Sequence, residues 1–185
     1  MIRFLCLFFL STLILTDNIN AKENIMILKL KDGDVKIEMF EDVAPNHVKR
    51  ITELANSGKY DNVVFHRVIE GFMAQTGDVQ FGNSSSKDFD LSKAGIGGSN
   101  LPDLKEEFNN IPHERGTVSM ARSSDPNSAN SQFFICFENA SYLDRQYTVF
   151  GRVIEGMDFV DKIKKGDGQS GSVTNPDKII SFKSQ

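Results

Sequence analysis

The sequence predicts a mainly β fold, in which one closed antiparallel sheet carries two helices on its outside. Two apolar-rich runs flank Lys31-Asp32-Gly33-Asp34, a pattern typical of a β-hairpin. Further short apolar runs recur between turn residues, whereas helical spacing of apolar residues occurs in only two segments. The length of 185 residues fits one domain better than two.

The composition is that of a globular protein with an acidic balance. Hydrophobic residues make up 39% of the chain and charged residues 25%, and phenylalanine (15 copies) must supply most of the aromatic bulk because tryptophan is absent. The formal net charge is -4, and the pI is near 5.4. A nucleic-acid-binding domain needs a basic face, so we expect no nucleic-acid partner.

The first residues have the features of a cleavable export signal. Arg3 gives a short positive start, residues 4–15 carry no charge, and Ala21 ends the polar stretch that follows. The apolar run is too short to cross a hydrocarbon core of ~30 Å as a helix rising ~1.5 Å per residue. We therefore expect a signal peptide at residues 1–21, a mature domain at residues 22–185 and no membrane anchor after cleavage. The alternative is an uncleaved anchor.

Cleavage would leave one cysteine in the mature chain. Cys6 lies in the removed segment, and Cys136 is the other cysteine of the sequence. No internal disulfide is then possible, so the core alone must stabilise the domain.

The predicted elements begin with the hairpin and a helix. Residues 25–30 and 35–40 are the two strands, and the second alternates apolar and charged residues as a half-buried strand does. Pro45 suits the first turn of a helix, and Gly58 suits its end. The apolar residues between them at helical spacing are Val48, Ile51 and Leu54.

Most of the remaining chain reads as short strands. A second, shorter helix is expected at residues 157–165, with Val160 and Ile163 facing inward. Residues 81–104 are rich in Gly and Ser and lack periodicity, so we expect a functional surface loop there. The further predicted strands are residues 63–69, 72–77, 117–121, 132–137, 148–153 and 178–182.

Several chemistries find no support in the sequence. His47, His66 and His113 are scattered, and with one remaining cysteine they do not form a zinc motif. Asp125-Pro126-Asn127 begins like a calcium loop but lacks the later oxygen ligands and the central glycine. There is no Gly-x-Ser-x-Gly elbow, no phosphate-binding glycine loop and no His spaced to serve a particular Ser. We expect no metal and no cofactor, and a hydrolase is disfavoured.

Two segments stand out, FHRVIEGFMAQTGD at residues 65–78 and SQFFIC at residues 131–136. If residues 63–69 form a strand, alternation places Phe65, Arg67 and Ile69 on one face and His66, as a structural residue, on the other. An unpaired arginine among apolar neighbours is costly. A structural ion pair, or an edge position with the stem along apolar surface, would also explain it. The pairs Phe72-Met73 and Phe133-Phe134 would by themselves most often be core.

These segments resemble the two signatures of the cyclophilins. The similarity continues through residues 116–121, 142–144 and 148–157 and covers nearly the whole chain after the apolar start. It implies an eight-stranded antiparallel barrel capped by two helices, and peptidyl-prolyl cis/trans isomerase activity on proline-containing polypeptides. Residues 87–104 resemble bacterial members of the family more than the compact eukaryotic ones.

The resemblance also implies which residues form the site. It implies three catalytic residues: the arginine of the family falls on Arg67, a residue of its hydrophobic proline pocket on Phe72, and its substrate-binding glutamine on Gln75. The remaining substrate-binding positions are Met73, Ala121, Arg122, Gln132, Phe134, Tyr142, Leu143 and Tyr147.

Three of these positions depart from the commonest pattern of the family. Tyr142 stands where many members have Trp, Tyr147 where many have His, and Arg122 where Asn is frequent. The Trp contributes to cyclosporin binding in the family, so the resemblance implies weak cyclosporin binding here.

The resemblance leaves alternatives in function and compartment. A cyclophilin-fold binding module or chaperone without useful turnover is the main alternative to an isomerase.

The export signal would suit a bacterial periplasm, which we expect from the loop at residues 87–104, or a eukaryotic secretory pathway. Asn83-Ser84-Ser85 and Asn139-Ala140-Ser141 would be glycosylation acceptors only in the second case. A single domain without a coiled coil favours a monomer.

Overall fold

The computed structural model describes residues 24–185, so the expected signal peptide at residues 1–21 lies outside the described residues. The described chain begins with the predicted hairpin. Strands β1 (Ile25–Leu30) and β2 (Gly33–Met39) pair antiparallel, with Leu30 opposite Gly33 at the turn. The inward residues of β2 are buried and the outward ones are not, as the alternation predicts.

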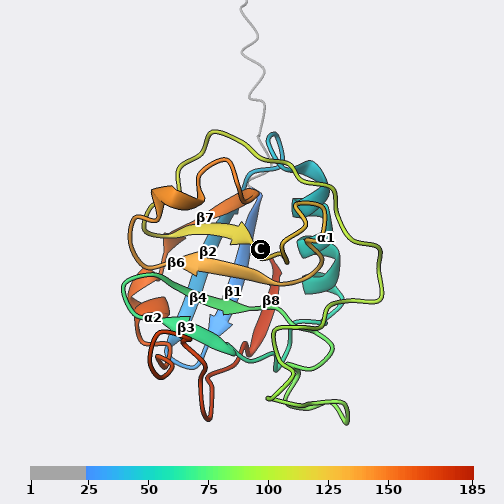
Figure 1. Cartoon of the computed structure of the whole chain (residues 1–185), viewed down its shortest axis with the longest axis vertical. Coiled ribbons are helices and arrows are strands. Elements are labelled where there is room, and N and C mark those ends of the chain that lie inside the picture. Colours follow the sequence, from blue (N-terminus) through green and yellow to red (C-terminus); the bar gives the residue numbers. More distant parts are fainter. Residues whose placement is uncertain (1–23) are drawn as a thin grey trace, which may run out of the picture.

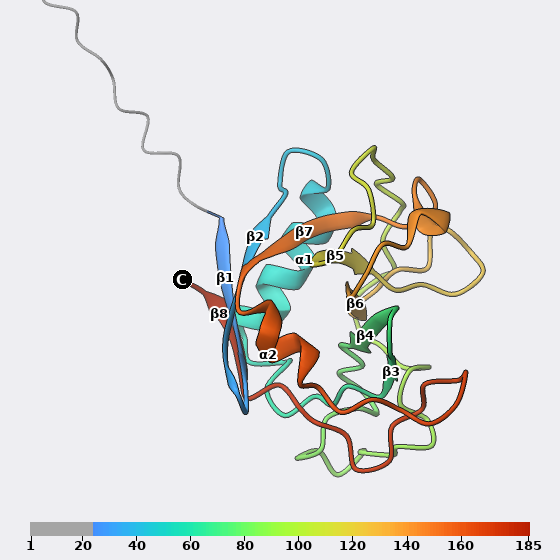
Figure 2. The same ribbon diagram turned by 90° about the vertical axis from the view of Figure 1, so that its left-hand side faces the viewer.

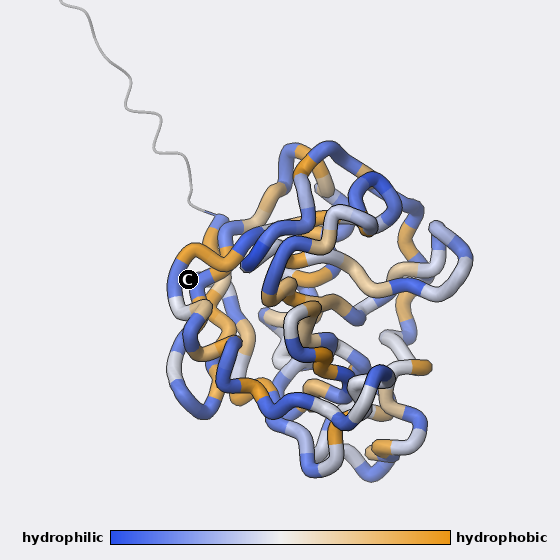
Figure 3. The backbone as a smooth tube through the Cα atoms, turned by 60° about the vertical axis from the view of Figure 1, so that its left-hand side comes forward, coloured by the Kyte–Doolittle hydropathy of each residue, from blue (hydrophilic) through white to orange (hydrophobic). Residues whose placement is uncertain are grey.

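Eight strands form one antiparallel sheet in the order β3-β4-β6-β5-β7-β2-β1-β8. The sheet curls around the core, with β1, β2 and β8 on one side and β3, β4 and β6 on the other (Figure 2). Hydrophobic and hydrophilic stretches alternate along the chain in Figure 3. The remaining strands are β3 (Arg67–Ile69), β4 (Met73–Thr76), β5 (Thr117–Met120), β6 (Phe133–Cys136), β7 (Val149–Glu155) and β8 (Ser181–Ser184).

The strands do not pair into a closed barrel, so that prediction is wrong. The sheet has two ends, β3 and β8, which form no ladder with each other, so the eight strands make a curled half-barrel. The outer edge of β3 is occupied by an irregular segment, because the Val68 N–H donates to the Gly171 carbonyl at 2.7 Å. Beside it, a single bridge joins Val64 to Lys178. We call residues 166–173, which lie between the second helix and β8, the seam segment.

Two helices lie at opposite sides of the curled sheet (Figure 1). Helix α1 (Pro45–Asn56) begins at the predicted proline, buries Val48, Ile51 and Leu54, and is followed by Gly58 with a φ of 71°. Helix α2 (Met157–Asp161) is shorter than predicted, although Val160 and Ile163 are buried as expected. No helix within residues 24–185 is long and apolar enough to cross a membrane.

The buried side chains form two clusters, one on each face of the sheet. Phe133 is fully buried in the main core, where its ring meets Tyr60, Phe150 and Phe182. Phe134, next in sequence, faces the other side because successive strand residues alternate. Of the Phe133-Phe134 pair, therefore, only the first belongs to the main core. The second cluster consists of Met73, Phe134, Cys136, Ala140 and Leu143.

Candidate active site

Strand register brings the predicted site residues into one row. Arg67 on β3 lies opposite Gln75 on β4, and Gln75 lies opposite Phe134 on β6. Phe134 in turn lies opposite Ser119 on β5. Residues directly opposite in an antiparallel sheet point to the same face. A charged donor, an amide and an aromatic ring therefore stand side by side on the outer face, over the second cluster.

The Arg67 side chain is half-buried and held by uncharged partners. Its Nε donates to the Ser170 carbonyl at 3.1 Å, and its Nη1 donates to Gln75 Oε1 at 3.4 Å. No ion pair formed within residues 24–185 involves this guanidinium, so the structural ion-pair interpretation is wrong for the described chain. None of its hydrogen bonds within those residues uses Nη2, which leaves a charged donor free.

The predicted alternation fails just before Arg67. Phe65 is fully buried in the main core beside Val68, whereas Arg67 and Ile69 lie on the outer face. The reason is that regular pairing starts only at Arg67, and the chain before it makes isolated bridges. The prediction that Phe65 shares a face with Arg67 is therefore wrong.

A small cavity of about 130 Å³ opens beside this row. It is far smaller than the ~300–1,000 Å³ of pockets for drug-sized ligands, and suits one compact side chain. Its floor is formed by the second cluster, in which burial raises the pKa of the Cys136 thiol to about 12 and so disfavours a thiolate. The lining residues are Arg67, Phe72, Met73, Gln75, Ala121, Arg122, Phe134, Leu143 and Tyr147.

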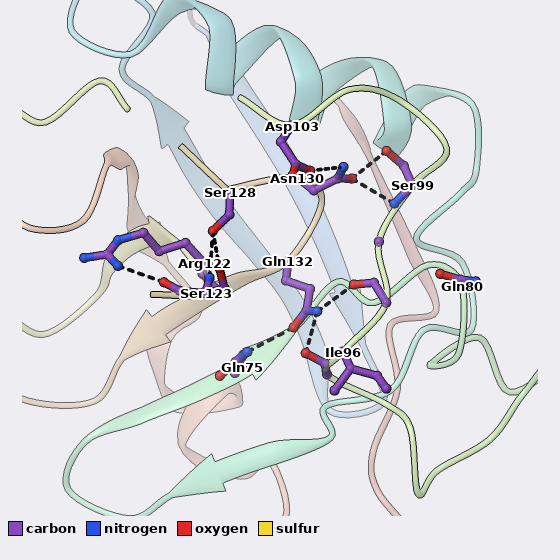
Figure 4. A pocket seen from close by; sticks show the side chains of 14 residues that line it. Gln75, Gln80, Ile96, Ser99, Asp103, Arg122, Ser123, Ser128, Asn130 and Gln132 are labelled. Carbon is purple, nitrogen blue, oxygen red and sulfur yellow. Dashed lines mark hydrogen bonds between the residues drawn. The ribbon is translucent and has the colours of Figure 1, made fainter. Parts of the chain in front are cut away.

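A larger cavity of about 530 Å³ adjoins the small one and shares Gln75, Ala121 and Arg122 with it. Gln132 belongs to this larger cavity. Its Nε2 donates to the carbonyls of Gly95 and Gly97, at 2.9 and 2.8 Å, and its Oε1 accepts from Gln75 Nε2 at 3.0 Å (Figure 4). These contacts tie the loop at residues 95–97 to Gln75 on β4 and to Gln132, the residue before β6.

The same loop is held by a carboxylate that sequence reasoning missed. Asp78 is fully buried; its Oδ2 accepts the N–H groups of Gly95 and Gly97, at 2.8 and 2.9 Å. Its Oδ1 accepts two further N–H groups, from Gln80 and Phe81. At Gly97 an added Cβ would lie 2.6 Å from Asp78 Oδ1, so only glycine fits. The sequence did contain a signal for this contact, namely an acidic residue at the end of segment 65–78 followed by glycines in the next loop.

Two tyrosines occupy the rim of the site. Tyr142 lies outside the lining of both cavities, is 63% exposed, and its ring centroid is 5.6 Å from that of Phe72. Tyr147 lines the small cavity and lies 4.4 Å below the Arg122 guanidinium. Of the eleven predicted residues, the structure thus brings nine around the small cavity, Gln132 beside it and Tyr142 onto its edge.

Behind Phe134 lies an arrangement that the sequence did not predict. His113 Nε2 is 3.0 Å from Ser119 Oγ, and His113 Nδ1 is 3.0 Å from Asp144 Oδ1. The prediction that no His is placed to serve a particular Ser is therefore wrong, because His113 lies within hydrogen-bond distance of Ser119. The chemistry of a nucleophile is nevertheless missing, because Ser119 is fully buried and its hydroxyl donates to the Thr148 carbonyl at 2.9 Å.

Neither of the buried histidines near the site carries charge at neutral pH. Burial lowers the pKa of His113, although the Asp144 carboxylate opposes this. Burial also lowers the pKa of His66 to about 4, although Asp78 opposes it. His66 is absent from the lining of both cavities and lies next to Gly95. Neither imidazole is therefore tuned for acid–base work near pH 7.

Comparison with known proteins agrees with this geometry. Residues 25–184 match the family model described as cyclophilin type peptidyl-prolyl cis-trans isomerase/CLD. A probable peptidyl-prolyl cis-trans isomerase of Brucella suis is 61% identical over 85% of this chain and 81% of its own length. An isomerase of Acinetobacter baylyi is 39% identical over 78% of this chain and 74% of its own.

A solved structure is similar over the whole described domain. A cyclophilin type peptidyl-prolyl cis-trans isomerase of Cryptosporidium parvum, crystallised in the presence of the dipeptide Ala-Pro, has a TM-score of 0.73 and 27% identity. The match covers 87% of this chain and 98% of that one. With nearly every residue after the apolar start matched to the family model, the chain belongs to the cyclophilin-type peptidyl-prolyl cis-trans isomerases.

Proposed function

We propose that this isomerase accelerates rotation about X–Pro bonds by stabilising the twisted imide without a covalent step. Rotation about a peptide bond costs ~18–20 kcal/mol because twisting removes amide resonance. A catalyst must therefore bind the twisted state more tightly than either planar state. In the twisted state the proline nitrogen becomes pyramidal and regains a lone pair that can accept a hydrogen bond.

Arg67 is the donor in this proposal. Its guanidinium is permanently charged, and two of its nitrogens are already held by Ser170 and Gln75. The free Nη2 can meet the imide nitrogen without titrating and with little loss of side-chain entropy. A polar contact made only in the twisted state contributes ~2–4 kcal/mol, so two or three such contacts account for a large acceleration.

The small cavity is the proposed site of the proline ring. Its apolar residues Phe72, Met73, Phe134 and Leu143 would hold the ring, while the flanking substrate backbone runs along Gln75, Ala121 and Gln132. The relative crystallised with Ala-Pro supports proline-containing polypeptides as substrates. The observation that carries the proposal is an arginine without a carboxylate partner in the described chain, at the edge of an apolar cavity of about 130 Å³.

Arg67→Ala tests this function. Turnover of a proline peptide should fall by orders of magnitude, while the thermal midpoint changes little because Arg67 contributes no described ion pair to the fold. Arg67→Lys should also have low turnover, since the hydrated point charge of an ammonium group does not reproduce the planar set of donors of a guanidinium. Wild-type turnover in Arg67→Ala would rule out the mechanism. Peptide binding by the wild type without any acceleration would instead favour a binding module.

We also propose that the chain is exported to a bacterial periplasm and acts there as a monomer. The positive start, the uncharged run at residues 4–15 and Ala21 support this. Fractionation of the native host and intact-mass measurement should give a soluble protein lacking residues 1–21. A membrane-bound form that retains Met1 would contradict the proposal.

A further inference from the structure

Arg122 stands where the two cavities meet. Its side chain lines both, and its guanidinium carbon lies 4.4 Å from the centroid of the Tyr147 ring. Its Nε and Nη2 donate to the Gln146 carbonyl at 3.2 and 2.9 Å. Its Nη1 donates to the Ser123 carbonyl at 2.8 Å (Figure 4). The charge is therefore fixed in place by a ring and carbonyl dipoles.

This charge is not neutralised by the described chain. No ion pair formed within residues 24–185 involves Arg122, and the same holds for Arg67 across the small cavity. The acids nearby are engaged elsewhere. Asp103, in the larger cavity, accepts from Asn130 at 2.9 Å, and Asp144 accepts from the His113 backbone at 2.8 Å. The small cavity is lined by two cationic side chains, Arg67 and Arg122, and by no acidic one, so this part of the groove is locally positive although the chain carries a net charge of -4.

We infer that this groove prefers prolines that have an acidic side chain within two residues. The inference rests on the proposed function, because it takes the small cavity as the site of the proline ring. An extended chain advances at most ~3.3–3.6 Å per residue. A carboxylate of the substrate within two residues of the proline can therefore reach Arg122 while Arg67 donates to the imide nitrogen. A guanidinium already held by Tyr147 loses little entropy on binding it.

Matched peptides test this preference. Peptides that differ only in carrying Glu, Gln or Lys are assayed, with the substitution placed at each of the two positions before and after the proline. At one or more positions kcat/KM should be about two- to fivefold higher for Glu than for Gln, the size expected for an exposed ion pair, and lowest for Lys. Raising the salt to ~0.5 M should bring the Glu/Gln ratio close to one, because exposed charges are screened.

Variants then identify the residue responsible. Arg122→Gln should reduce the Glu/Gln ratio toward one, whereas Arg122→Lys, which keeps the charge, should retain most of it. Lys49→Gln is the matched control, because it removes the same charge from an exposed position on α1 outside both cavities. Its ratio should equal that of the wild type. Circular dichroism of each variant verifies that the fold is kept.

The outcomes separate this inference from the proposed function. Turnover of the Gln peptide with no preference for Glu at any position would overturn the inference and leave the isomerase intact. A Glu preference that survives in Arg122→Gln would overturn the role of Arg122. Absence of turnover with every peptide would instead remove the proposed function on which the inference rests.

Discussion

The imidazole of His113 lies nearly parallel to the phenyl ring of Phe134, with 16° between the planes and 6.1 Å between the centroids. One wall of the small cavity therefore rests on a buried histidine. The same imidazole contacts Asp144, which follows the cavity residue Leu143, and Ser119 on β5. His113 thus connects two walls of the cavity to the sheet behind them.

Two substitutions separate the ring of His113 from its hydrogen bonds. His113→Gln removes the stacked ring, and since an aromatic pair contributes ~0.5–1.5 kcal/mol, KM for a proline peptide should rise about two- to tenfold. His113→Phe keeps a ring but leaves Asp144 and Ser119 without this partner, so the free energy of unfolding should fall by ~1–3 kcal/mol with KM little changed. Steady-state kinetics and urea unfolding measure both. Equal rises in KM would show that the hydrogen bonds, and not the stacked ring, shape the cavity.

Asp78→Asn should loosen the loop that borders the larger cavity. An amide offers one acceptor oxygen to the four N–H groups that now share the carboxylate, and its NH₂ would face donors. Each buried N–H left without an acceptor costs ~1–3 kcal/mol. Hydrogen exchange at the Gly95 and Gly97 amides should therefore accelerate by at least about tenfold. Asp90→Asn, in an exposed part of the same loop, is the control. Equal hydrogen-exchange rates at the Gly95 and Gly97 amides in the two variants would contradict the role of Asp78.

Tyr142 is expected to set drug sensitivity more than turnover. The family resemblance implies that a Trp here donates its indole N–H to cyclosporin, and the Tyr hydroxyl lies at the ring tip instead. A drug carbonyl left without a partner costs ~1–3 kcal/mol, or roughly a tenfold to hundredfold loss of affinity. Inhibition should therefore be weak in the wild type and tighter in Tyr142→Trp. Turnover should change far less, because Tyr142 is 63% exposed outside the small cavity. Equal, tight inhibition of both proteins would refute this.

Burial of His66 predicts a loss of stability in mild acid. Its folded pKa is about 4, below the ordinary value of 6.5, because burial disfavours the charged ring. The unfolded chain then binds more protons than the folded one, so this contribution is complete above pH ~6.5 and is lost as the pH falls to ~4. At ~1.36 kcal/mol per pKa unit, the loss is on the order of 3 kcal/mol.

Chemical denaturation at several pH values measures this dependence, and His66→Gln is the informative variant. Gln does not titrate, so the variant should show a smaller decrease in unfolding free energy between pH ~6.5 and ~4 than the wild type. Burial also lowers the pKa values of His47 and His113, so part of the decrease should remain. An identical pH dependence in the two proteins would contradict the assignment to His66.

The sequence predicted what depends on local periodicity. The β1–β2 hairpin and the start of α1 at Pro45 follow from alternation and proline chemistry. The strand predicted from residue 63 was too long, because Val63 and Val64 pair with distant loops instead of a neighbouring strand. The closed barrel failed for the same reason, since a loop occupies the outer edge of β3.

The site was predicted from resemblance and completed only by tertiary structure. Nine of the eleven predicted residues line one small cavity, although no spacing rule would have gathered them. The contacts that were missed join residues far apart in sequence. Ser119 and Asp144 meet at His113 across 6 and 31 residues, and Asp78 reaches Gly95 and Gly97 across 17 and 19. Such pairings depend on strand register and loop path, which a single sequence does not specify.

The Ser170 carbonyl that holds Arg67 belongs to the seam segment, which also covers the outer edge of β3. The guanidinium is thus positioned by the exposed part of this segment, residues 167–170, and no residue of the segment lines the small cavity. Residues of the seam segment can accordingly be varied to adjust the angle of Arg67 while Phe134 and Leu143 stay in place. Gly171 sets a limit on this freedom, because its φ is 69° and an added Cβ would lie 2.3 Å from Ile69. Directed evolution for altered turnover could therefore act on residues 167–170, which line neither cavity.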